Sequence, residues 1–349
     1  MGHPDEFIVH GWPFLLDKKW VMVKMISLLV VLSACFCLHG RAQSSDRMLF
    51  GDTSHRGVPF SKDPHVVKFN GNYLMYFSVP PFDGNPDPIN GWAIGIAKSS
   101  DLVNWEKVGE ILPEGDYETK GLCAPGALVI GGQVHLFYQT YGNWREDAIC
   151  HAVSNDGISF ERNPSNPIFR PTGDWNCGRA IDAEVIRFKD RYLLYFATRD
   201  SSMTIQMQGV AAAPLNTNFN REDWTQLTDE PIFSPKYPWE GQCVEGASII
   251  QRGDGLYMFY AGAYNNAPQQ VGVAKSADGI HWERLSNKPF LPNGDPGEWN
   301  SCESGHPHIF EDDDGRTYLF FQGNNDFGKT WMISKREVSW TAKGPKLVD

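Results

Sequence analysis

Short apolar runs alternate with polar turns along most of the chain, and one arrangement recurs about every 60 residues. Each recurrence contains an apolar run, a tight turn and a second run rich in aromatic residues. Gly, Asn and Asp dominate these turns, which predicts β-hairpins. The hairpins begin at Asp63, Ala124, Asp182, Glu245 and His306, at intervals of 61, 58, 63 and 61 residues. Their turns are predicted at residues 70–71, 131–132, 189–190, 254–255 and 314–315.

A second cassette follows three of the hairpins and predicts two further strands per repeat. It consists of a turn with Ser and Asp, then an aromatic residue and Glu, at residues 100–106, 154–161 and 276–283. Degenerate versions lie at 221–226 and 325–331. Four strands per repeat are the unit of a propeller blade, and the chain after Ala42 has room for five such repeats.

The sequence therefore predicts an all-β, five-bladed β-propeller with four antiparallel strands per blade. It would occupy residues 43–349, and residues 47–51 would complete the last blade and close the ring. A β-sandwich is the alternative, but sandwiches seldom repeat with so regular a period.

The N-terminal segment has the composition of a secretory leader. Residues 22–37 combine Lys24 with an apolar run that is too short to span a bilayer. Residues 32–35 resemble a bacterial lipobox, in which Cys35 would carry a lipid anchor; alternatively, a signal peptidase would cut after Ala42. Either route predicts that residues 1–42 are an upstream extension plus leader. The mature protein would be secreted, periplasmic or an outer-membrane lipoprotein.

Composition narrows the class of protein. A hydrophobic content of 41% is ample for a core, and a net charge of −11 argues against a nucleic-acid partner. The 12 Trp residues suit stacking on sugar rings. Five cysteines remain after the leader and contain no C-x-x-C pair, so structural zinc is not expected. Because five is odd, at least one thiol would be free or pair between chains.

The first residues of the five hairpins are predicted to surround one cavity, because the first strand of each blade lines the propeller axis. This places three carboxylates and one imidazole together: Asp63, Asp182, Glu245 and His306. Buried carboxylates are costly unless they are paired, so such a cluster usually has a function. Glycoside hydrolysis needs one protonated and one ionised carboxyl group. The alternative is ion pairing with arginines, or a structural ion at the axis.

The short motifs at these positions resemble glycoside hydrolase family 43 and its five-bladed relatives, families 32, 62 and 117. The matching motifs are Lys62-Asp63-Pro64, Ala124-Pro125, Ile181-Asp182, Glu245-Gly246 and Gly305-His306. The resemblance covers essentially the whole mature chain. Two departures concern substrate rather than chemistry. Family members often place a Trp or Phe shortly before the first Asp, whereas here the stretch is Val58-Pro59-Phe60-Ser61-Lys62, and Ala247 replaces a frequent Pro.

This resemblance implies roles for individual residues. Asp63 would be the general base and Glu245 the general acid, with Asp182 raising the pKa of the acid and orienting it. The reaction would invert the anomeric centre. His306 would hold an axial Ca²⁺ or Na⁺ ion, and no organic cofactor is implied.

Other residues are predicted to lie around the mouth of the cavity. Trp175, Trp239 and Trp299 would stack on sugar faces, or alternatively pack between blades. Arg179, Arg199 and Glu303 would bind sugar hydroxyls or a uronate, or alternatively form ion pairs or be solvated. His308 would face the same side as His306, deeper in the channel, where an axial metal or water site is plausible. The acidic run 311–314 is expected to be a solvated hairpin tip.

The predicted function is an exported glycosidase that cleaves terminal glycosidic bonds in fragments of plant or algal polysaccharides. The released unit would be of the arabinofuranose, xylose or galactose type, and anhydrogalactose units of agar are also possible substrates. One alternative is a sugar-binding propeller without catalytic activity. Another is a glycoside phosphorylase of the same fold, which needs a cluster of Arg, His and Lys. The predicted ring contains one imidazole and no lysine in register, which favours hydrolysis.

Overall fold

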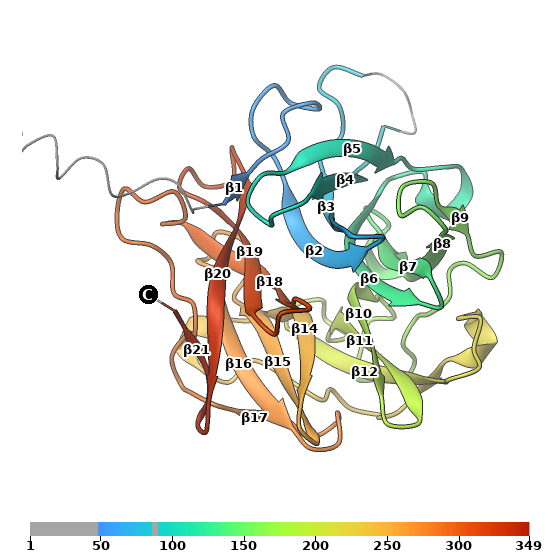
Figure 1. Ribbon diagram of the computed structural model, residues 1–349. Helices are drawn as coiled ribbons and strands as arrows, with labels where there is room; N and C mark the ends of the chain where they lie inside the picture. The colour runs from blue at the N-terminus through green and yellow to red at the C-terminus, as the bar shows by residue number, and fades with distance from the viewer. Residues whose placement is uncertain (1–47, 86–89, 349) are drawn as a thin grey trace, which may run out of the picture. The chain divides into compact units, whose positions relative to one another are not determined.

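Residues 48–85 and 90–348 are described by the computed structural model, and they form five β-sheets arranged around an axis (Figure 1). The predicted leader, including Cys35 and the cleavage site after Ala42, lies outside the described residues. Among the described residues, no helix is long and apolar enough to cross a membrane. The short helical turns are single 3₁₀ turns: η1 (Asp116–Glu118), η2 (Trp144–Glu146), η3 (Arg221–Asp223) and η4 (Pro238–Glu240).

Each sheet is one blade, and its strands follow one another in chain order from the axis outward. Blade 1 contains β2 (Lys62–Phe69), β3 (Asn72–Val79), β4 (Ala93–Ser99) and β5 (Glu106–Ile111). Blade 2 contains β6 (Leu122–Ile130), β7 (Gln133–Thr140), β8 (Ile149–Ser154) and β9 (Glu161–Arg162). Blade 3 contains β10 (Ile181–Phe188), β11 (Arg191–Arg199), β12 (Gln206–Pro214) and β13 (Thr225–Gln226). Blade 4 contains β14 (Val244–Arg252), β15 (Gly255–Gly262), β16 (Gln270–Ser276) and β17 (Glu283–Arg284).

The fifth blade joins the two ends of the described chain. It contains β18 (Glu303–Glu311), β19 (Thr317–Asn324) and β20 (Met332–Thr341), and both β1 (Leu49–Phe50) and β21 (Gly344–Leu347) pair with β20. The five-bladed, all-β prediction is confirmed, as is the prediction that the segment after residue 46 completes the last blade. Because β1 comes from the start of the propeller, its pairing with β20 closes the ring.

The predicted turns follow the sequence pattern closely, with one shift. In blade 4, Arg252 pairs with Gly255, so the hairpin turn is Gly253-Asp254, one residue earlier than predicted. Gly253 has a φ of +58°, which a glycine adopts without the steric cost of a side chain. The Ser and Asp cassettes form compact turns between the third and fourth strands. In blade 4, for example, Asp278 accepts hydrogen bonds from the backbone of the two residues at 280–281.

The hydrophobic core is divided into five clusters, each lying between two neighbouring blades. Near the axis the blades approach so closely that a Cβ atom on Gly126 would lie 2.2 Å from the carbonyl oxygen of Ala183 in the next blade. Lateral packing between sheets therefore provides most of the apolar burial, and the strands of one blade depend on both neighbours.

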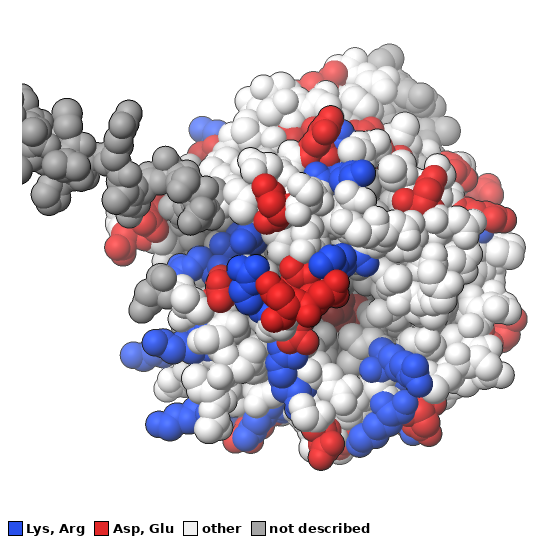
Figure 2. Space-filling model, in the orientation of Figure 1, with Lys and Arg blue, Asp and Glu red and all other residues white. Residues whose placement is uncertain are grey.

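Ion pairs between blades add to this packing on the surface. The acidic run 311–314 is not simply solvated, as expected from the sequence, because Lys68 of blade 1 pairs with Asp312 at 2.8 Å and Arg252 of blade 4 pairs with Glu311. Asp312 also accepts a hydrogen bond from the Tyr73 hydroxyl. Figure 2 shows the resulting surface, on which basic and acidic side chains lie side by side. The charges of this hairpin tip thus tie blade 5 to its two neighbours.

The closure of the ring can be tested at Met48, which is 1% exposed and belongs to the cluster between blades 1 and 5. We expect Met48→Ala to lower the free energy of unfolding by about 2–5 kcal/mol, the usual cost of truncating a buried side chain. The adjacent Leu49 is 46% exposed, so Leu49→Ala should change stability by no more than about 0.5 kcal/mol. Urea unfolding followed by tryptophan fluorescence measures both values; equal effects would contradict this account of closure.

Candidate active site

The inner strand of every blade contains the same irregularity near its start. Its pairing with the second strand is interrupted over two residues, and then resumes. The first of these two residues has a left-handed φ of +43° to +56° in all five blades. These residues, which we call the axial ring, are Asp63, Ala124, Asp182, Gly246 and His306. A left-handed φ costs a non-glycine residue about 1–2 kcal/mol, and such strain tends to occur at functional sites.

The axial ring corrects the predicted register in blade 4. Glu245 pairs with Ala261 and precedes the irregularity, so the ring position belongs to Gly246. A Cβ atom at Gly246 would lie 3.1 Å from the Nδ1 atom of His306, and glycine leaves this space free. The residue in register with Glu245 in blade 1 is Lys62, which pairs with Ser78 before the same irregularity.

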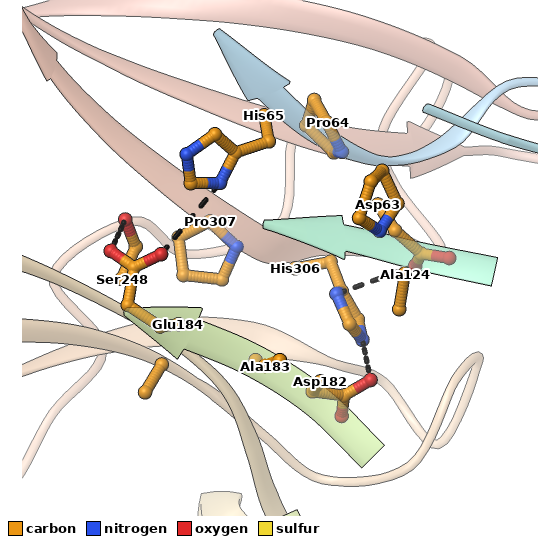
Figure 3. Close-up of a pocket in the computed structure, with 13 residues that line it drawn as sticks. Asp63, Pro64, His65, Ala124, Asp182, Ala183, Glu184, Ser248, His306 and Pro307 are labelled. Carbon is orange, nitrogen blue, oxygen red and sulfur yellow. Dashed lines mark hydrogen bonds and ion pairs between the residues drawn. The ribbon is translucent and has the colours of Figure 1, made fainter. Parts of the chain in front are cut away.

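The three predicted carboxylates nevertheless converge on one imidazole. His306 Nδ1 lies 3.3 Å from Asp63 Oδ1, and its Nε2 lies 3.8 Å from both Asp182 Oδ1 and Glu245 Oε1. Asp63, Asp182 and Glu245 are each at most 8% exposed. Figure 3 shows His306 between Asp63 and Asp182 at the edge of a cavity of about 30 Å³. The sequence therefore correctly predicted that these four side chains meet.

Their proximity separates the protonation behaviour of the two aspartates. Burial raises the pKa of Asp63, but the charges of His306 and Lys62 outweigh it and hold this pKa below its usual value. Burial is the main cause that raises the pKa of Asp182, to about 7. The charge of His306 lowers this pKa, and the neighbouring Glu245 and Asp63 raise it further. Burial lowers the pKa of His306, yet the three carboxylates around it raise this pKa above its usual value overall. The ring therefore favours an ionised Asp63 beside a protonated imidazole.

Side chains from neighbouring blades fix the backbone of the two ring aspartates. The N–H of Asp63 donates to Gln322 Oε1 at 2.8 Å, and the N–H of Asp182 donates to Gln139 Oε1 at 2.7 Å. In the same way the N–H of Ala124 donates to Ser78 Oγ. The sequence analysis missed these residues, although Gln139 and Gln322 occupy matching positions in the second strands of repeats two and five. Aligning the repeats would have revealed them.

Amide side chains also hold the carboxylate of Glu245. Gln269 Nε2 donates to Glu245 Oε1 at 2.7 Å, and Gln206 Nε2 donates to Oε2. Gln206 is in turn held by Arg199, whose Nε donates to Gln206 Oε1 at 2.9 Å. Arg199, predicted to bind substrate, thus supports Glu245 through an intermediate residue. The orientation of Glu245 is set by hydrogen bonds that the sequence analysis did not foresee.

The other predicted charged residues lie close to the ring in different settings. Arg179 is 8% exposed and pairs with Asp147, with 3.2 Å between Nε and Oδ2. Glu303 is completely buried rather than solvated, and accepts hydrogen bonds from Gln322 and the backbone of Asn266. Burial raises the pKa of Glu303 to about 7 against the opposing charge of Lys62. Substrate contacts by Arg179 and Glu303 stay predictions.

The three predicted tryptophans pack between and within blades. A Cβ atom on Gly209 would lie 3.0 Å from the ring of Trp175, and one on Gly262 would lie 2.3 Å from the ring of Trp239. The ring of Trp299 lies 5.6 Å from that of Phe321. All three belong to the margins of the hydrophobic clusters and are partly buried. This arrangement supports the packing alternative, and stacking on sugars through their exposed edges stays a prediction.

Lys62 is a site residue that the sequence analysis did not single out. Its Nζ lies 2.5 Å from Asn265 Oδ1 and 4.5 Å from the centre of the Trp331 ring. Burial lowers the pKa of Lys62, but Asp63, Glu303 and Glu245 raise it overall. The axial ring itself contains no lysine, as predicted, but Lys62 lies directly before it, in register with Glu245.

The donors around His306 suit a cation. Asp182, Glu245 and His306 each offer one ligand atom, and these atoms lie within 4.8 Å of one another. Asp182 Oδ2 is buried and has no hydrogen-bond partner, so its lone pairs are free to bind a cation. Carboxylate oxygens are ligands that Ca²⁺ accepts. The residues present thus fit the ion predicted at His306, which stays a prediction. All five described cysteines are free thiols.

Comparison with known proteins identifies the family to which this chain belongs. A sequence profile of glycosyl hydrolases family 43 matches residues 58–344, which include the whole axial ring. The chain belongs to this family. A crystal structure of a thermostable family-43 glycoside hydrolase superposes with a TM-score of 0.64 at 19% identity, covering 83% of this chain and 93% of that one. At this identity the likeness concerns the fold.

Relatives of this family-43 glycosidase include enzymes of two kinds. It is 25% identical over 299 residues to sucrose-6-phosphate hydrolase of Escherichia coli, covering 79% of this chain and 56% of that protein. The chain thus spans about half the length of this relative. It is 23% identical over 229 residues to 1,2-beta-oligomannan phosphorylase of Thermoanaerobacter sp. (strain X514), covering 62% of this chain and 70% of that protein.

The hydrogen bonds beneath the ring aspartates can be tested at Gln139. We expect Gln139→Ala to lower the free energy of unfolding by about 1–3 kcal/mol, because it leaves the buried N–H of Asp182 without an acceptor. Gln133 lies on the same strand, but its side chain hydrogen-bonds at the surface, so Gln133→Ala should be nearly neutral. Chemical denaturation of the two variants compares them directly. A neutral Gln139→Ala would show that Asp182 does not need this support.

Proposed function

We propose that this glycosidase hydrolyses terminal glycosidic bonds with inversion, using Asp63 as general base and Glu245 as general acid. The observation that carries the proposal is the meeting of three buried carboxylates at the single imidazole of His306. Membership of family 43 supports the same reaction class. A glycosidic bond needs both a proton donor to the leaving oxygen and a base that activates water.

The environment of each carboxyl group supports its assigned role. Asp63, whose pKa lies below its usual value, is ionised and can accept a proton from the attacking water. Glu245 receives hydrogen bonds from two amide groups, which fix the orientation of its carboxyl group. Asp182, beside both, orients His306 and adds negative charge near the oxocarbenium-like transition state.

The spacing of the two groups supports inversion. Asp63 and Glu245 contact opposite nitrogens of one imidazole, at 3.3 and 3.8 Å. The imidazole therefore lies between the two carboxyl groups and keeps them apart. Inverting enzymes keep their two carboxyl groups about 6.5–9.5 Å apart for this reason, against about 5–5.5 Å in retaining enzymes.

A Ca²⁺ or Na⁺ ion beside His306 is part of the proposal. When bound, it supplies positive charge next to the carboxylates. The ion would take the place of the extra imidazole proton, so that neutral His306 would provide a nitrogen ligand, with Asp182 Oδ2 as the nearby oxygen that has no hydrogen-bond partner.

The proposed substrates are oligosaccharides from plant or algal polysaccharides, and the proposed site of action is outside the cytoplasm. Membership of family 43 supports a carbohydrate substrate, and the exposed edges of the Trp residues near the ring are the proposed stacking surfaces. The leader sequence supports export, with a lipid anchor at Cys35 as one route.

Phosphorolysis is a second candidate, favoured by the position of Lys62. The partly buried Lys62 beside Asp63 and the buried Arg179 are the kinds of groups that bind phosphate. The similarity to 1,2-beta-oligomannan phosphorylase points the same way.

Conservative substitutions test the catalytic assignment. We expect Asp63→Asn and Glu245→Gln each to lower kcat by about 10²–10⁴-fold or more, because each removes a proton-transfer group. For Glu245→Gln the loss should be smaller on nitrophenyl glycosides, whose leaving group needs no proton. Asp254→Asn, at an exposed turn of the same blade, is the matched control and should keep full activity. Unchanged sugar affinity in all variants, with no turnover by the wild type on a broad glycan panel, would favour a sugar-binding protein instead.

The reaction outcome separates the remaining alternatives. With an active substrate, ¹H NMR should show the product appearing first as the anomer opposite to that of the substrate. The rate should be the same with and without inorganic phosphate. Retention of configuration would refute the assigned geometry, and a strict requirement for phosphate with release of a sugar phosphate would establish phosphorolysis.

A further inference from the structure

A second group of titratable side chains lies on the axis beyond the ring. His65, Glu184 and His308 each follow a ring residue by two positions, on the inner strands β2, β10 and β18. They are 7%, 5% and 5% exposed, and one potential ligand atom from each lies within 4.8 Å of the others. We call these three residues the axial histidine cluster. The glycosidase reaction proposed above does not use them.

Hydrogen bonds determine which nitrogen of each histidine carries a proton. His65 Nε2 lies 2.9 Å from the carbonyl oxygen of Ala127, and His308 Nε2 lies 2.9 Å from that of Val66. A carbonyl oxygen can only accept, so both Nε2 atoms must donate. Burial lowers the pKa of both imidazoles, that of His308 to about 4. Each ring is therefore neutral and exposes a lone pair at Nδ1.

When Glu184 is ionised, the cluster contains more acceptors than donors. Glu184 Oε1 accepts hydrogen bonds from Ile249 N and from Ser248 Oγ, whose single hydroxyl proton must serve His308 Nδ1 as well. Glu184 Oε2 lies 3.7 Å from His65 Nδ1. Burial raises the pKa of Glu184 to about 8, so without an ion its carboxyl group keeps a proton that lies close to His65 Nδ1. The ion pairs of the described residues give Glu184 no lysine or arginine partner. Figure 3 shows His65 and Ser248 directed at Glu184. A cation between the three side chains would displace the proton of Glu184 and accept a lone pair from each of them.

We propose that His65 Nδ1, His308 Nδ1 and Glu184 Oε2 bind one divalent transition-metal ion, with a water molecule in the axial cavity as a further ligand. Two imidazoles and one carboxylate suit Zn²⁺ and its neighbours in the first transition row, whereas Ca²⁺ and Mg²⁺ prefer sites made of oxygen ligands. The hydrogen bonds from Nε2 to backbone carbonyls are those that ligating histidines make in metal sites. The cavity of about 30 Å³, lined by His65 and Glu184, has room for one water molecule.

Another histidine pair in the protein shows why the carboxylate matters. His135 Nδ1 and His151 Nε2 lie 3.0 Å apart in blade 2, so one imidazole can donate directly to the other. Neither is grouped with a carboxylate as a possible metal site among the described residues. The axial histidines cannot pair in this way, since both donor protons point to the backbone. Their ligand atoms also come from blades 1, 3 and 5, so a bound ion would cross-link three sheets.

The proposal is tested by metal binding to the purified full chain after treatment with a chelator. Titration with Co²⁺ should give visible d–d absorption bands of a four- or five-coordinate site at one ion per chain, and Zn²⁺ should displace it. Zn²⁺ should also raise Tm in proportion to the logarithm of its concentration above Kd. Absence of a stoichiometric site for Co²⁺ and Zn²⁺ would overturn the proposal.

Glu184→Gln is the decisive variant. Its amide oxygen can still accept from Ile249 N, while its NH₂ group can donate to the two Nδ1 atoms, so the variant should fold without metal. We expect metal affinity to fall by at least about 100-fold, and His65→Asn, a second variant, should behave likewise. His135→Gln is the matched histidine control and should bind normally. Retained affinity in both Glu184→Gln and His65→Asn would refute these ligands.

A last comparison separates this site from the ion proposed at His306. His306→Gln should keep the Co²⁺ spectrum, because His306 is not a ligand of the axial histidine cluster. Loss of the spectrum in His306→Gln but not in Glu184→Gln would place the ion in the axial ring and overturn the proposal. None of these measurements depends on glycosidase activity, so the outcome is independent of the proposed reaction.

Discussion

Electrostatic balance around one buried imidazole is the constraint on which the active centre depends. Three carboxylates from blades 1, 3 and 4 are buried near the axis and would repel one another without a compensating charge. His306 of blade 5 contacts all three, and its pKa rises accordingly. Removing carboxylates from water is costly unless they are paired, so the position of His306 makes the cluster possible. It also ties four separate sheets to a common point.

Holding these charges in place requires a rigid frame, and the propeller supplies it in two ways. Hydrophobic clusters between neighbouring blades fix the sheets relative to one another. Near the axis, the side-chain oxygens of Gln322 and Gln139, on second strands, accept hydrogen bonds from the backbone N–H groups of Asp63 and Asp182. These bonds hold the left-handed backbone that turns both aspartates into the cavity. The strain of the axial ring is thus supported by the blade that precedes each aspartate.

Two layers of titratable side chains, the axial ring and the axial histidine cluster, lie along the same axis. The irregularity in each inner strand directs the ring residue into one layer, and the residue two positions later contributes to the next. The first layer is acidic and contains the proposed catalytic groups. The second contains two imidazoles, whose Nε2 atoms donate to backbone carbonyls, and one buried carboxyl group beside them. The fivefold arrangement can therefore build distinct sites from adjacent positions of the same strands.

Some of this organisation was predictable because it is periodic along the chain. The five hairpins, the number of blades and the meeting of Asp63, Asp182, Glu245 and His306 follow from a repeat of about 60 residues and from the geometry of a closed ring. The closing role of residues 47–51 followed from the same count. Trp175, Trp239 and Trp299 were predicted around the mouth of the cavity, but their packing between strands depends on the glycines opposite them, which no local pattern reveals.

Other features were decided only by the tertiary structure. The offset of Glu245 from the ring position and the entry of Lys62 beside Asp63 depend on strand register, which one irregularity changes by a residue. The hydrogen bonds from Gln206 and Gln269 to Glu245 join side chains that are 39 and 24 residues away in sequence. Sequence by itself determined which strands form and how often they recur, because that depends on local hydrophobic pattern and turn chemistry. Which side chains share protons and charge was decided by the packing of one blade against the next.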